Sequence, residues 1–331
     1  MTISGLGPHG EKAVPADKIV LSEAEAATAR AGRFAIAIVL HTTASDWARE
    51  ELSGIRASLE AYGATIAEIV DCGFSKERQN AALLRLAVSE IHAVISIPIG
   101  NNSVAQGHRA VSRASKTLVL LDNAPTGFQP GEDYASLVSA DNFGLGAIAA
   151  RLLSQHLQNE GVSGILTYGA DFFATNEREI GFRSWMDRNR PDVTLVRGRF
   201  TAVEEAGAAF ERLFDQNEDM DGLFVVWDVP ALRALEAIKN RGLGVAVTTV
   251  DLGNEAVASL IEGSLLKGIA AQLPYEQGKA AGLVTLLALI GRHPPTWVAM
   301  PGFAVRSDDV GAAYRAVWRR PMPAELKSPE K

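Results

Sequence analysis

Polar and aromatic side chains follow several apolar segments of the sequence, at the point where each apolar run ends. Asp122 and Asn123 follow TLVLL, Trp227 follows GLFVV, Asp251 follows AVTTV and Gln272 follows KGIAA. Each of these residues alone is more simply explained as the cap of the next helix, a position that Asp and Asn often occupy. Together they suit a carbohydrate, because its hydroxyls both donate and accept hydrogen bonds and its C–H face stacks on an indole.

A polar segment from His41 to Asp46 follows the apolar run of residues 34–40 and precedes a helical pattern that begins at Trp47. In an open α/β sheet, ligands bind beyond the carboxyl ends of the strands, so a ligand is expected near this segment. The segment contains no glycine, and therefore it is neither a dinucleotide-binding turn nor a phosphate-binding loop. Asp46 either contacts a ligand or caps the following helix, whereas His41 is more simply a structural side chain.

The composition is that of an acidic globular protein. With 331 residues the chain is long enough for two domains, and 47% hydrophobic with 21% charged residues excludes disorder and a membrane class. The 32 Lys and Arg against 39 Asp and Glu give a net charge of −7, and no basic tract occurs. This charge balance disfavours nucleic acid as a partner. The scattered histidines and the single Cys72 lack metal-ligand spacing, so neither a metal nor a cofactor is expected.

The elements that must position these side chains alternate between apolar strands and amphipathic helices. A first series predicts strands at 34–40, 64–70, 93–97 and 117–121, separated by helices from 47, at 76–88 and at 104–114. A strand at 135–139 follows. A second series predicts helices at 142–158, 177–189, 203–215 and 230–240, and strands at 164–168, 193–200, 222–226 and 246–250. The chain then continues through a strand at 269–273, a helix at 277–290 and a strand at 298–305. Two series of β-α units predict two doubly wound α/β lobes with parallel sheets.

The N-terminal residues predict one short helix at 21–31, with Ser22 as its cap and Glu25 at the capping-box position. A single short helix does not make a helix-turn-helix reader of DNA.

The motifs in chain order resemble the periplasmic sugar-binding proteins of ABC transporters, of the ribose-binding and galactose-binding type. The resemblance covers residues 34–305 and rests on IAIVLHTTASDW, LVLLDNAP, VSADNFGLG, FATNEREIGFRSW, GLFVVWD, TTVD and GIAAQLPYEQG. It implies a type I periplasmic-binding-protein fold, in which two Rossmann-like lobes are joined by three hinge crossings. The implied division is a tail with a short helix at 1–33, an N-terminal lobe at 34–139 plus 273–301, and a C-terminal lobe at 140–272 plus 302–331.

The same resemblance implies ligand contacts from both lobes. Those of the N-terminal lobe fall on Ser45, Trp47, Asp122 and Asn123, and those of the C-terminal lobe on Asn176, Phe200, Trp227, Asp251 and Gln272. Asp46 and Arg178 are added as candidates on their own chemistry. Arg178 either binds ligand or pairs with the acids around Glu177 and Glu179, while Asp228 more simply caps a helix.

Ribose binders carry an arginine at the positions of Asn123 and Asn176 and an asparagine at that of Trp227. Loss of two guanidinium groups and gain of an indole imply a ligand other than ribose, such as another monosaccharide or a polyol.

The function implied is capture of a sugar or polyol and its delivery to an ABC transporter membrane permease, by a monomer in the periplasm. The expected location assumes that a signal peptide absent from the given sequence was removed. The alternative is the effector-binding core of a lactose-repressor-type regulator that lacks its DNA-binding domain; the acidic charge weighs against it. An enzyme on a doubly wound fold is disfavoured, because the chain has no G-x-S-x-G elbow and no dinucleotide loop.

Overall fold

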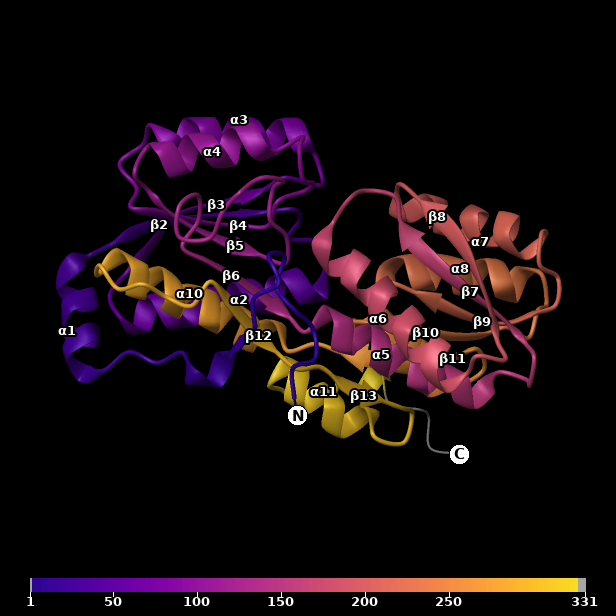
Figure 1. Cartoon of the computed structure of the whole chain (residues 1–331). Helices are drawn as coiled ribbons and strands as arrows, with labels where there is room; N and C mark the ends of the chain where they lie inside the picture. The colour runs from indigo at the N-terminus through magenta and orange to yellow at the C-terminus, as the bar shows by residue number, and fades with distance from the viewer. Residues whose placement is uncertain (1, 327–331) are drawn as a thin grey trace.

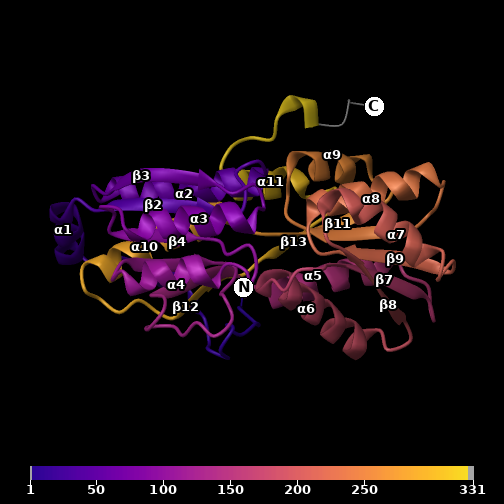
Figure 2. The ribbon, with the colours of Figure 1, turned by 90° about the horizontal axis from the view of Figure 1, so that it is seen from above.

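Two sheets, each covered by helices on both faces, form two lobes that lie side by side (Figures 1 and 2). The computed structural model describes residues 2–326. This architecture confirms the predicted fold class of two doubly wound α/β lobes. Among the described residues, no helix combines the length and the apolar character that crossing a membrane requires.

The N-terminal lobe contains a seven-stranded sheet in which all pairs are parallel. Its spatial order is β1 (Val14–Pro15), β12 (Trp297–Met300), β6 (Ser136–Ala140), β5 (Thr117–Leu121), β4 (Ala93–Ser96), β2 (Ala35–Leu40) and β3 (Thr65–Asp71). Helices α3 (Lys76–Ala87) and α4 (Ala105–Arg113) cover one face, and α1 (Glu23–Gly32), α2 (Asp46–Ala61) and α10 (Pro274–Leu289) cover the other (Figure 1).

Strand β2 shows why these apolar runs become central strands. Ile36, Ile38 and Leu40 are fully buried in the core beneath α2 and α10, while Ala37 and Val39 are fully buried in the core beneath α3 and α4. Alternate side chains of a strand point to opposite faces, so a strand covered on both sides needs an uninterrupted apolar sequence.

The C-terminal lobe contains a six-stranded sheet. Its order is β13 (Phe303–Val305), β11 (Leu266–Ala271), β10 (Ala246–Val250), β9 (Met220–Val225), β7 (Val162–Tyr168) and β8 (Thr194–Phe200), with only β13 antiparallel to its neighbour. Helices α5 (Asn142–Leu153) and α6 (Phe173–Asn189) cover one face, and α7 (Ala206–Phe214), α8 (Asp228–Asn240) and α9 (Asn254–Glu262) the other (Figure 2). The remaining elements are α11 (Val310–Trp318) and the 3-10 turns η1 (Ala16–Lys18), η2 (Ser154–His156), η3 (Val203–Glu205) and η4 (Ala324–Leu326).

The chain passes between the two sheets three times. It crosses after β6, after β11, and between β12 and β13, where Pro301 and Gly302 interrupt the single strand expected at 298–305. The two halves of that expected strand therefore belong to different lobes. The three crossings agree with the predicted fold, and the division of residues between the lobes stays a prediction.

Residues before the first long strand contribute to the N-terminal lobe. The capping box of α1 is confirmed, since the Ser22 hydroxyl accepts from the Glu25 backbone N–H and the Glu25 carboxylate accepts from the Ser22 N–H at 2.9 Å. Strand β1, which the sequence did not predict, adds an edge to the sheet beside β12. The backbone N–H groups of Ser4 and Gly5 donate to the Asp141 carboxylate at 2.7 and 2.9 Å, which ties this segment to the first crossing.

Glycines allow two pairs of helices to approach closely. A Cβ on Gly278 of α10 would lie 1.9 Å from the carbonyl oxygen of Glu51 in α2, and a Cβ on Gly146 of α5 would lie 2.0 Å from that of Arg178 in α6. Neither position tolerates a side chain without a shift of backbone. These approaches place Glu51 against α10 and Arg178 against α5.

Candidate ligand-binding site between the lobes

Two of the predicted aspartates have an uncommon backbone conformation at the ends of their strands. Asp122, after β5, has φ of 53°, and Asp251, after β10, has φ of 76°. Left-handed backbone is uncommon for residues other than glycine, although Asp and Asn adopt it more readily than most. Both side chains are buried, at 4% and 8% exposure. Strained residues with buried carboxylates at strand ends are typical of ligand sites.

On the N-terminal side, Asp122 belongs to a small polar group with two helical residues that the sequence reasoning missed. One Asp122 carboxylate oxygen accepts from the Gln277 side-chain amide at 2.9 Å, and its other oxygen has no partner within the described chain. Glu51 of α2 is fully buried and its carboxylate lies beside the Gln277 side chain, but neither of its oxygens has a hydrogen bond of ordinary geometry within the described chain. Burial, with a smaller effect from Asp122, raises the pKa of Glu51 well above its usual range.

On the C-terminal side, the Gln272 amide donates to the Asp251 carboxylate, while the Gln272 carbonyl oxygen has no partner among residues 2–326. Asp228, at the start of α8, is also buried and accepts from the Gly253 backbone N–H at 2.9 Å. Burial and the neighbouring Asp251 raise the pKa of Asp228 to about 8. The N-cap of α8 is Trp227 and no side chain caps that helix, so Asp228 does not fill the expected capping role; its carboxylate bonds the residue before α9 instead.

Arg178 is a buried cation whose charge lowers the pKa of one acid from each lobe. It is 5% exposed, its Nε donates to the Asn142 side-chain oxygen and its Nη1 to the Val226 carbonyl oxygen, both at 2.9 Å. Burial raises the pKa of Asp122 to about 6, and the Arg178 charge opposes that shift. Arg178 opposes the upward pKa shift of Asp251 in the same way, after burial as the main cause. The Arg178 charge therefore acts on one carboxylate from each lobe, while its own hydrogen bonds go to Asn142 and Val226.

The alternative that Arg178 pairs with the acids around Glu177 and Glu179 is not seen within residues 2–326. Glu179 pairs instead with Arg183 at 3.1 Å and with Arg197 at 2.7 Å. Helix α6 begins at Phe173, earlier than the predicted start at Glu177, and this places Arg178 within the helix against α5. The guanidinium is held by neutral oxygens, and its role toward a ligand stays a prediction.

Aromatic side chains gather at the strand ends of the C-terminal lobe. The Trp227 ring centroid lies 5.2 Å from that of Phe200 and 5.3 Å from that of Tyr168. Tyr168 ends β7 and was missed, although the strand-end rule that selected its neighbours applies to it equally. Trp47 comes from the other lobe at the start of α2, and its buried indole N–H has no partner in the described part of the chain. Whether the two indoles stack on one ligand stays a prediction.

Several other predicted residues make protein contacts. The Ser45 hydroxyl caps α2 by accepting from the Ala48 N–H at 3.1 Å. Asn123 accepts from the Phe173 N–H of the C-terminal lobe at 3.0 Å and donates to the Pro98 carbonyl oxygen at 3.1 Å. Asn176 donates to Asp171 at 2.8 Å. Their side chains are thus occupied in this conformation, and their contact with a ligand is untested.

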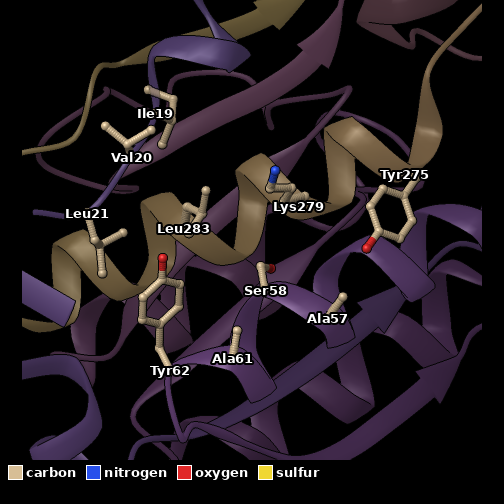
Figure 3. Close-up of a pocket in the computed structure, with 10 residues that line it drawn as sticks. All are labelled: Ile19, Val20, Leu21, Ala57, Ser58, Ala61, Tyr62, Tyr275, Lys279 and Leu283. Carbon is tan, nitrogen blue, oxygen red and sulfur yellow. The ribbon is translucent and has the colours of Figure 1, made fainter. Parts of the chain in front are cut away.

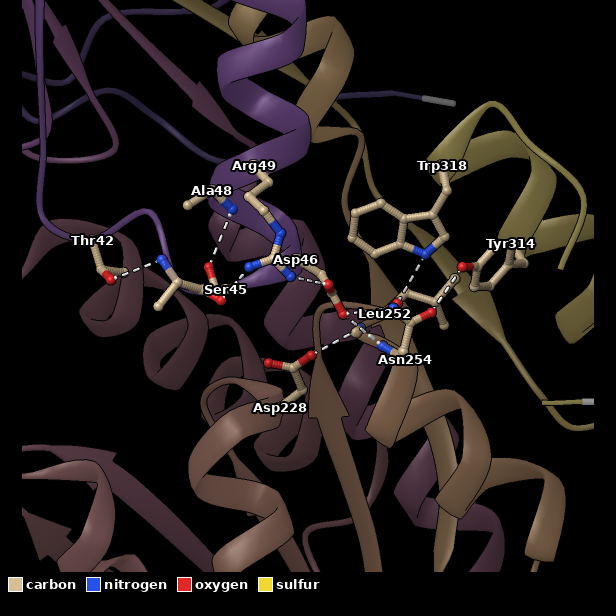
Figure 4. A network of polar contacts seen from close by, with 12 residues as sticks. Thr42, Ser45, Asp46, Ala48, Arg49, Asp228, Leu252, Asn254, Tyr314 and Trp318 are labelled. Carbon is tan, nitrogen blue, oxygen red and sulfur yellow. Dashed lines mark hydrogen bonds and ion pairs between the residues drawn. The ribbon is translucent and has the colours of Figure 1, made fainter. Parts of the chain in front are cut away.

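Asp46 bridges the lobes (Figure 4). One carboxylate oxygen accepts from both the backbone N–H and the side-chain amide of Asn254, at 2.9 and 3.0 Å, and the other oxygen accepts from Arg49. Asn254 begins α9, so a carboxylate from the N-terminal lobe caps a helix of the C-terminal lobe. The side-chain amide oxygen of Asn254 accepts from the Tyr314 hydroxyl at 2.8 Å.

A cavity of about 370 Å³ lies elsewhere, on the N-terminal lobe between the segment preceding α1 and helices α2 and α10 (Figure 3). Ile19, Leu21, Tyr62 and Leu283 are among its lining residues, and none of the predicted ligand residues is. Within residues 2–326, no three His, Cys, Asp or Glu side chains are grouped to hold a metal ion.

Comparison with known proteins agrees with the architecture. The ribose import binding protein RbsB of Bacillus subtilis (strain 168) is 26% identical over 220 residues, which is 64% of this chain and 68% of that protein. An ABC transporter solute binding protein from Agrobacterium vitis, bound with alpha-D-tagatopyranose, superposes with a TM-score of 0.77 at 21% identity, over 86% of this chain and 99% of that one.

Two further crystal structures show the same fold. A solute binding protein from Mycobacterium smegmatis with bound glycerol has a TM-score of 0.75 at 21% identity, and covers 84% of this chain and 96% of its own. One from Bacillus halodurans C-125 with bound myo-inositol has a TM-score of 0.74 at 17% identity, over 85% and 97%. The type I periplasmic-binding-protein fold is thereby confirmed. A family model, the periplasmic binding protein domain, matches residues 36–293 and so most of the chain, which belongs to that family.

Proposed function

We propose that this chain is the solute-binding protein of an ABC transporter. It captures a monosaccharide or polyol between its lobes, outside the cytoplasmic membrane, and as a monomer presents it to the membrane permease. The relatives support this class of ligand, since they include a ribose import protein and solute-binding proteins with bound tagatose, glycerol or myo-inositol. These ligands share several hydroxyls and carry no net charge.

The observation that carries the proposal is a set of buried oxygens that have no hydrogen-bond partner among residues 2–326 and that come from both sides of the lobe junction. Asp122, Glu51 and Gln277 supply them from the N-terminal lobe, and Gln272 supplies one at the second crossing. A buried acceptor without a partner costs about 1–3 kcal/mol, so a folded protein rarely keeps several together without a reason. A polyhydroxylated ligand that donates to them removes that cost.

The proposed contacts are those of the predicted residues. Asp122 and Asp251 accept from ligand hydroxyls, and Trp47 and Trp227 stack on the C–H surface of the ligand. The remaining candidates are Ser45, Asp46, Asn123, Asn176, Arg178, Phe200 and Gln272.

Two other functions fit the observations less well. A lactose-repressor-type regulator would use the same fold, but the relatives identified are import proteins, and the net charge of −7 is unsuited to DNA. Catalysis is also not the activity of this family, whose members bind solutes for transport.

Capture and release require the lobes to move. We propose that residues 34–139 plus 273–301 and residues 140–272 plus 302–326 rotate as rigid bodies about the three crossings; the last five residues of the predicted C-terminal lobe lie outside the described residues. A ligand with contacts in both lobes binds the closed form better, and so shifts the population toward it. Small-angle scattering is expected to give a smaller radius of gyration with saturating ligand; an equal radius in a protein shown to bind would refute this motion.

A thermal-shift screen against pentoses, hexoses, deoxysugars, alditols and inositols tests the proposed function, followed by calorimetry on each hit. A ligand that binds only the native state stabilises it by about 2.7 kcal/mol at a concentration of a hundred times the Kd, and this raises the melting temperature. The double variant Asp122→Ala with Asp251→Ala serves as the control and is expected to lose the shift. Failure of every sugar and polyol to bind wild type would refute the proposal.

A further inference from the structure

The lobe junction holds more negative than positive groups. Glu51, Asp122, Asp228 and Asp251 are each at least nine-tenths buried, and within residues 2–326 Arg178 is the one arginine or lysine buried to that extent. None of the four carboxylates forms a salt bridge within the described chain. Fully ionised, they would set four negative charges against one positive charge. An uncompensated buried charge is costly, so these carboxyls must either bind protons or receive a further cation.

The buried junction atoms that have no hydrogen-bond partner within residues 2–326 indicate whether the ligand supplies a proton or a cation. They are one donor, the Trp47 indole nitrogen, and five oxygens: both carboxylate oxygens of Glu51, one of Asp122, and the amide oxygens of Gln272 and Gln277. The amide nitrogens of Gln272 and Gln277 already donate to Asp251 and Asp122. A hydroxyl brings one donor and two acceptor lone pairs, whereas an ammonium brings three donors and no acceptor. An ammonium therefore matches a site with surplus acceptors better than a further hydroxyl does.

The aromatic side chains at the junction also favour a cationic ligand. Trp227, Phe200 and Tyr168 form a cluster at the strand ends of the C-terminal lobe, and Trp47 comes from the other lobe. Indole is the strongest of the side-chain rings in attracting a cation, and desolvation increases that attraction. The Arg178 guanidinium is already bonded to Asn142 and Val226. Buried carboxylates and indoles at the same junction are therefore a suitable environment for an alkylammonium.

We propose that the ligand is a sugar or polyol that carries a protonated amine, with the amine between Asp122 and Asp251 and the remaining hydroxyls at the glutamines. This inference rests on the proposed function, whose test uses neutral compounds. Burial, with a smaller contribution from repulsion by Asp251, raises the pKa of Asp122 to about 6 and that of Asp228 to about 8 in the free protein. A bound cation opposes those shifts, so it is expected to release protons that a neutral sugar leaves in place.

Matched pairs of compounds test the inference. Each pair contains an amino compound, such as D-glucosamine, D-galactosamine or a 1-amino-1-deoxyalditol, and its hydroxyl parent. The uncharged N-acetyl derivative of each amine serves as a further control. At pH 7 the amine of at least one pair is expected to bind about ten times more tightly than its parent, a difference of 1.4 kcal/mol. Calorimetry in phosphate and in Tris is expected to give different apparent enthalpies for the amine, because released protons are taken up by the buffer.

The variants Asp122→Asn and Asp251→Asn keep the shape of the side chain and remove its charge. They are expected to reduce the preference for the amine over its parent about tenfold, with circular dichroism and melting temperature reporting that they are folded. Parents that bind as tightly as their amines in every pair would overturn the inference and leave the proposed function standing. Failure of parents and amines alike would overturn both.

Discussion

Because the hydrogen bonds between Asp46 and Asn254 join the two lobes, we expect the variant Asp46→Ala to open the lobes and to weaken ligand binding. In Asp46→Ala, helix α9 loses a carboxylate that accepts from the Asn254 N–H at 2.9 Å and from its side-chain amide at 3.0 Å. The Asp46 side chain is 23% exposed, so water replaces part of what is lost. Two hydrogen bonds to a charged acceptor, discounted for that exposure, correspond to about 1–3 kcal/mol in favour of the closed form.

The expected consequence is weaker binding with the ligand contacts intact. Apparent affinity falls with the fraction of protein in the competent state, so a shift of about 1–3 kcal/mol reduces it by up to about 5- to 150-fold. Calorimetry measures the affinity, and small-angle scattering of the free protein measures the opening. If Asp46 instead touches only the ligand, affinity falls while the radius of gyration of the free protein stays that of wild type.

Two further variants make the comparison specific. Arg49→Ala removes the partner of Asp46 within its own helix, an exposed pair that is expected to contribute less than about 1 kcal/mol. Asn254→Ala removes one of the two donors and keeps the backbone N–H, so a smaller loss than that of Asp46→Ala is expected. An Asp46→Ala protein with wild-type affinity and wild-type radius of gyration would refute the role of the bridge.

Three other perturbations follow from the geometry. Asp122→Ala and Asp251→Ala each remove a buried charged acceptor and are expected to weaken ligand binding about ten- to a hundredfold by calorimetry; wild-type affinity in both would refute the site. Asp228 has its pKa raised to about 8 by burial and Asp251, so the stability it gives as a neutral group is complete below the unfolded pKa near 3.8 and is lost as pH rises through 8. The melting temperature of ligand-free Asp228→Asn is therefore expected to fall less than that of wild type from pH 5 to pH 9, and parallel curves would contradict the shift. Gly278→Ala places a Cβ 1.9 Å from the Glu51 carbonyl oxygen and is expected to lower stability in urea by about 1–3 kcal/mol, whereas Gly311→Ala, with open space at its Cβ, is the control.

The main features of the fold were predictable because they depend on local patterns. The apolar run that became β2 is buried on both faces, and Asp122, Asp251 and Gln272 indeed follow the strands that predicted them. The carboxyl ends of parallel strands meet at one edge of a sheet, so a one-dimensional pattern was sufficient to bring such residues together.

Glu51 was missed for a reason that the structure makes clear. In DWAREELSG it stands beside another glutamate and is easily taken for a solvated position, yet Ala48, Ile55 and Ser58 share its buried helix face. Its spacing from Ile55 was the available signal. The bridge from Asp46 to Asn254 had no such signal, because it joins residues that meet only through the relative placement of the two lobes.

The distribution of contacts around the junction links the proposed ligand binding to the proposed closure of the lobes. Asp46 and Asn123 already bond residues of the opposite lobe without a ligand, so closure has some stability of its own. The buried acids act against it, because desolvating Glu51, Asp122, Asp228 and Asp251 together raises the pKa of each. A ligand that donates to these oxygens removes the opposing contribution and leaves the bridges unopposed. The ligand therefore need not supply the whole free energy of closure; it needs only to satisfy the groups that closure buries, and that requirement selects for ligands rich in hydrogen-bond donors.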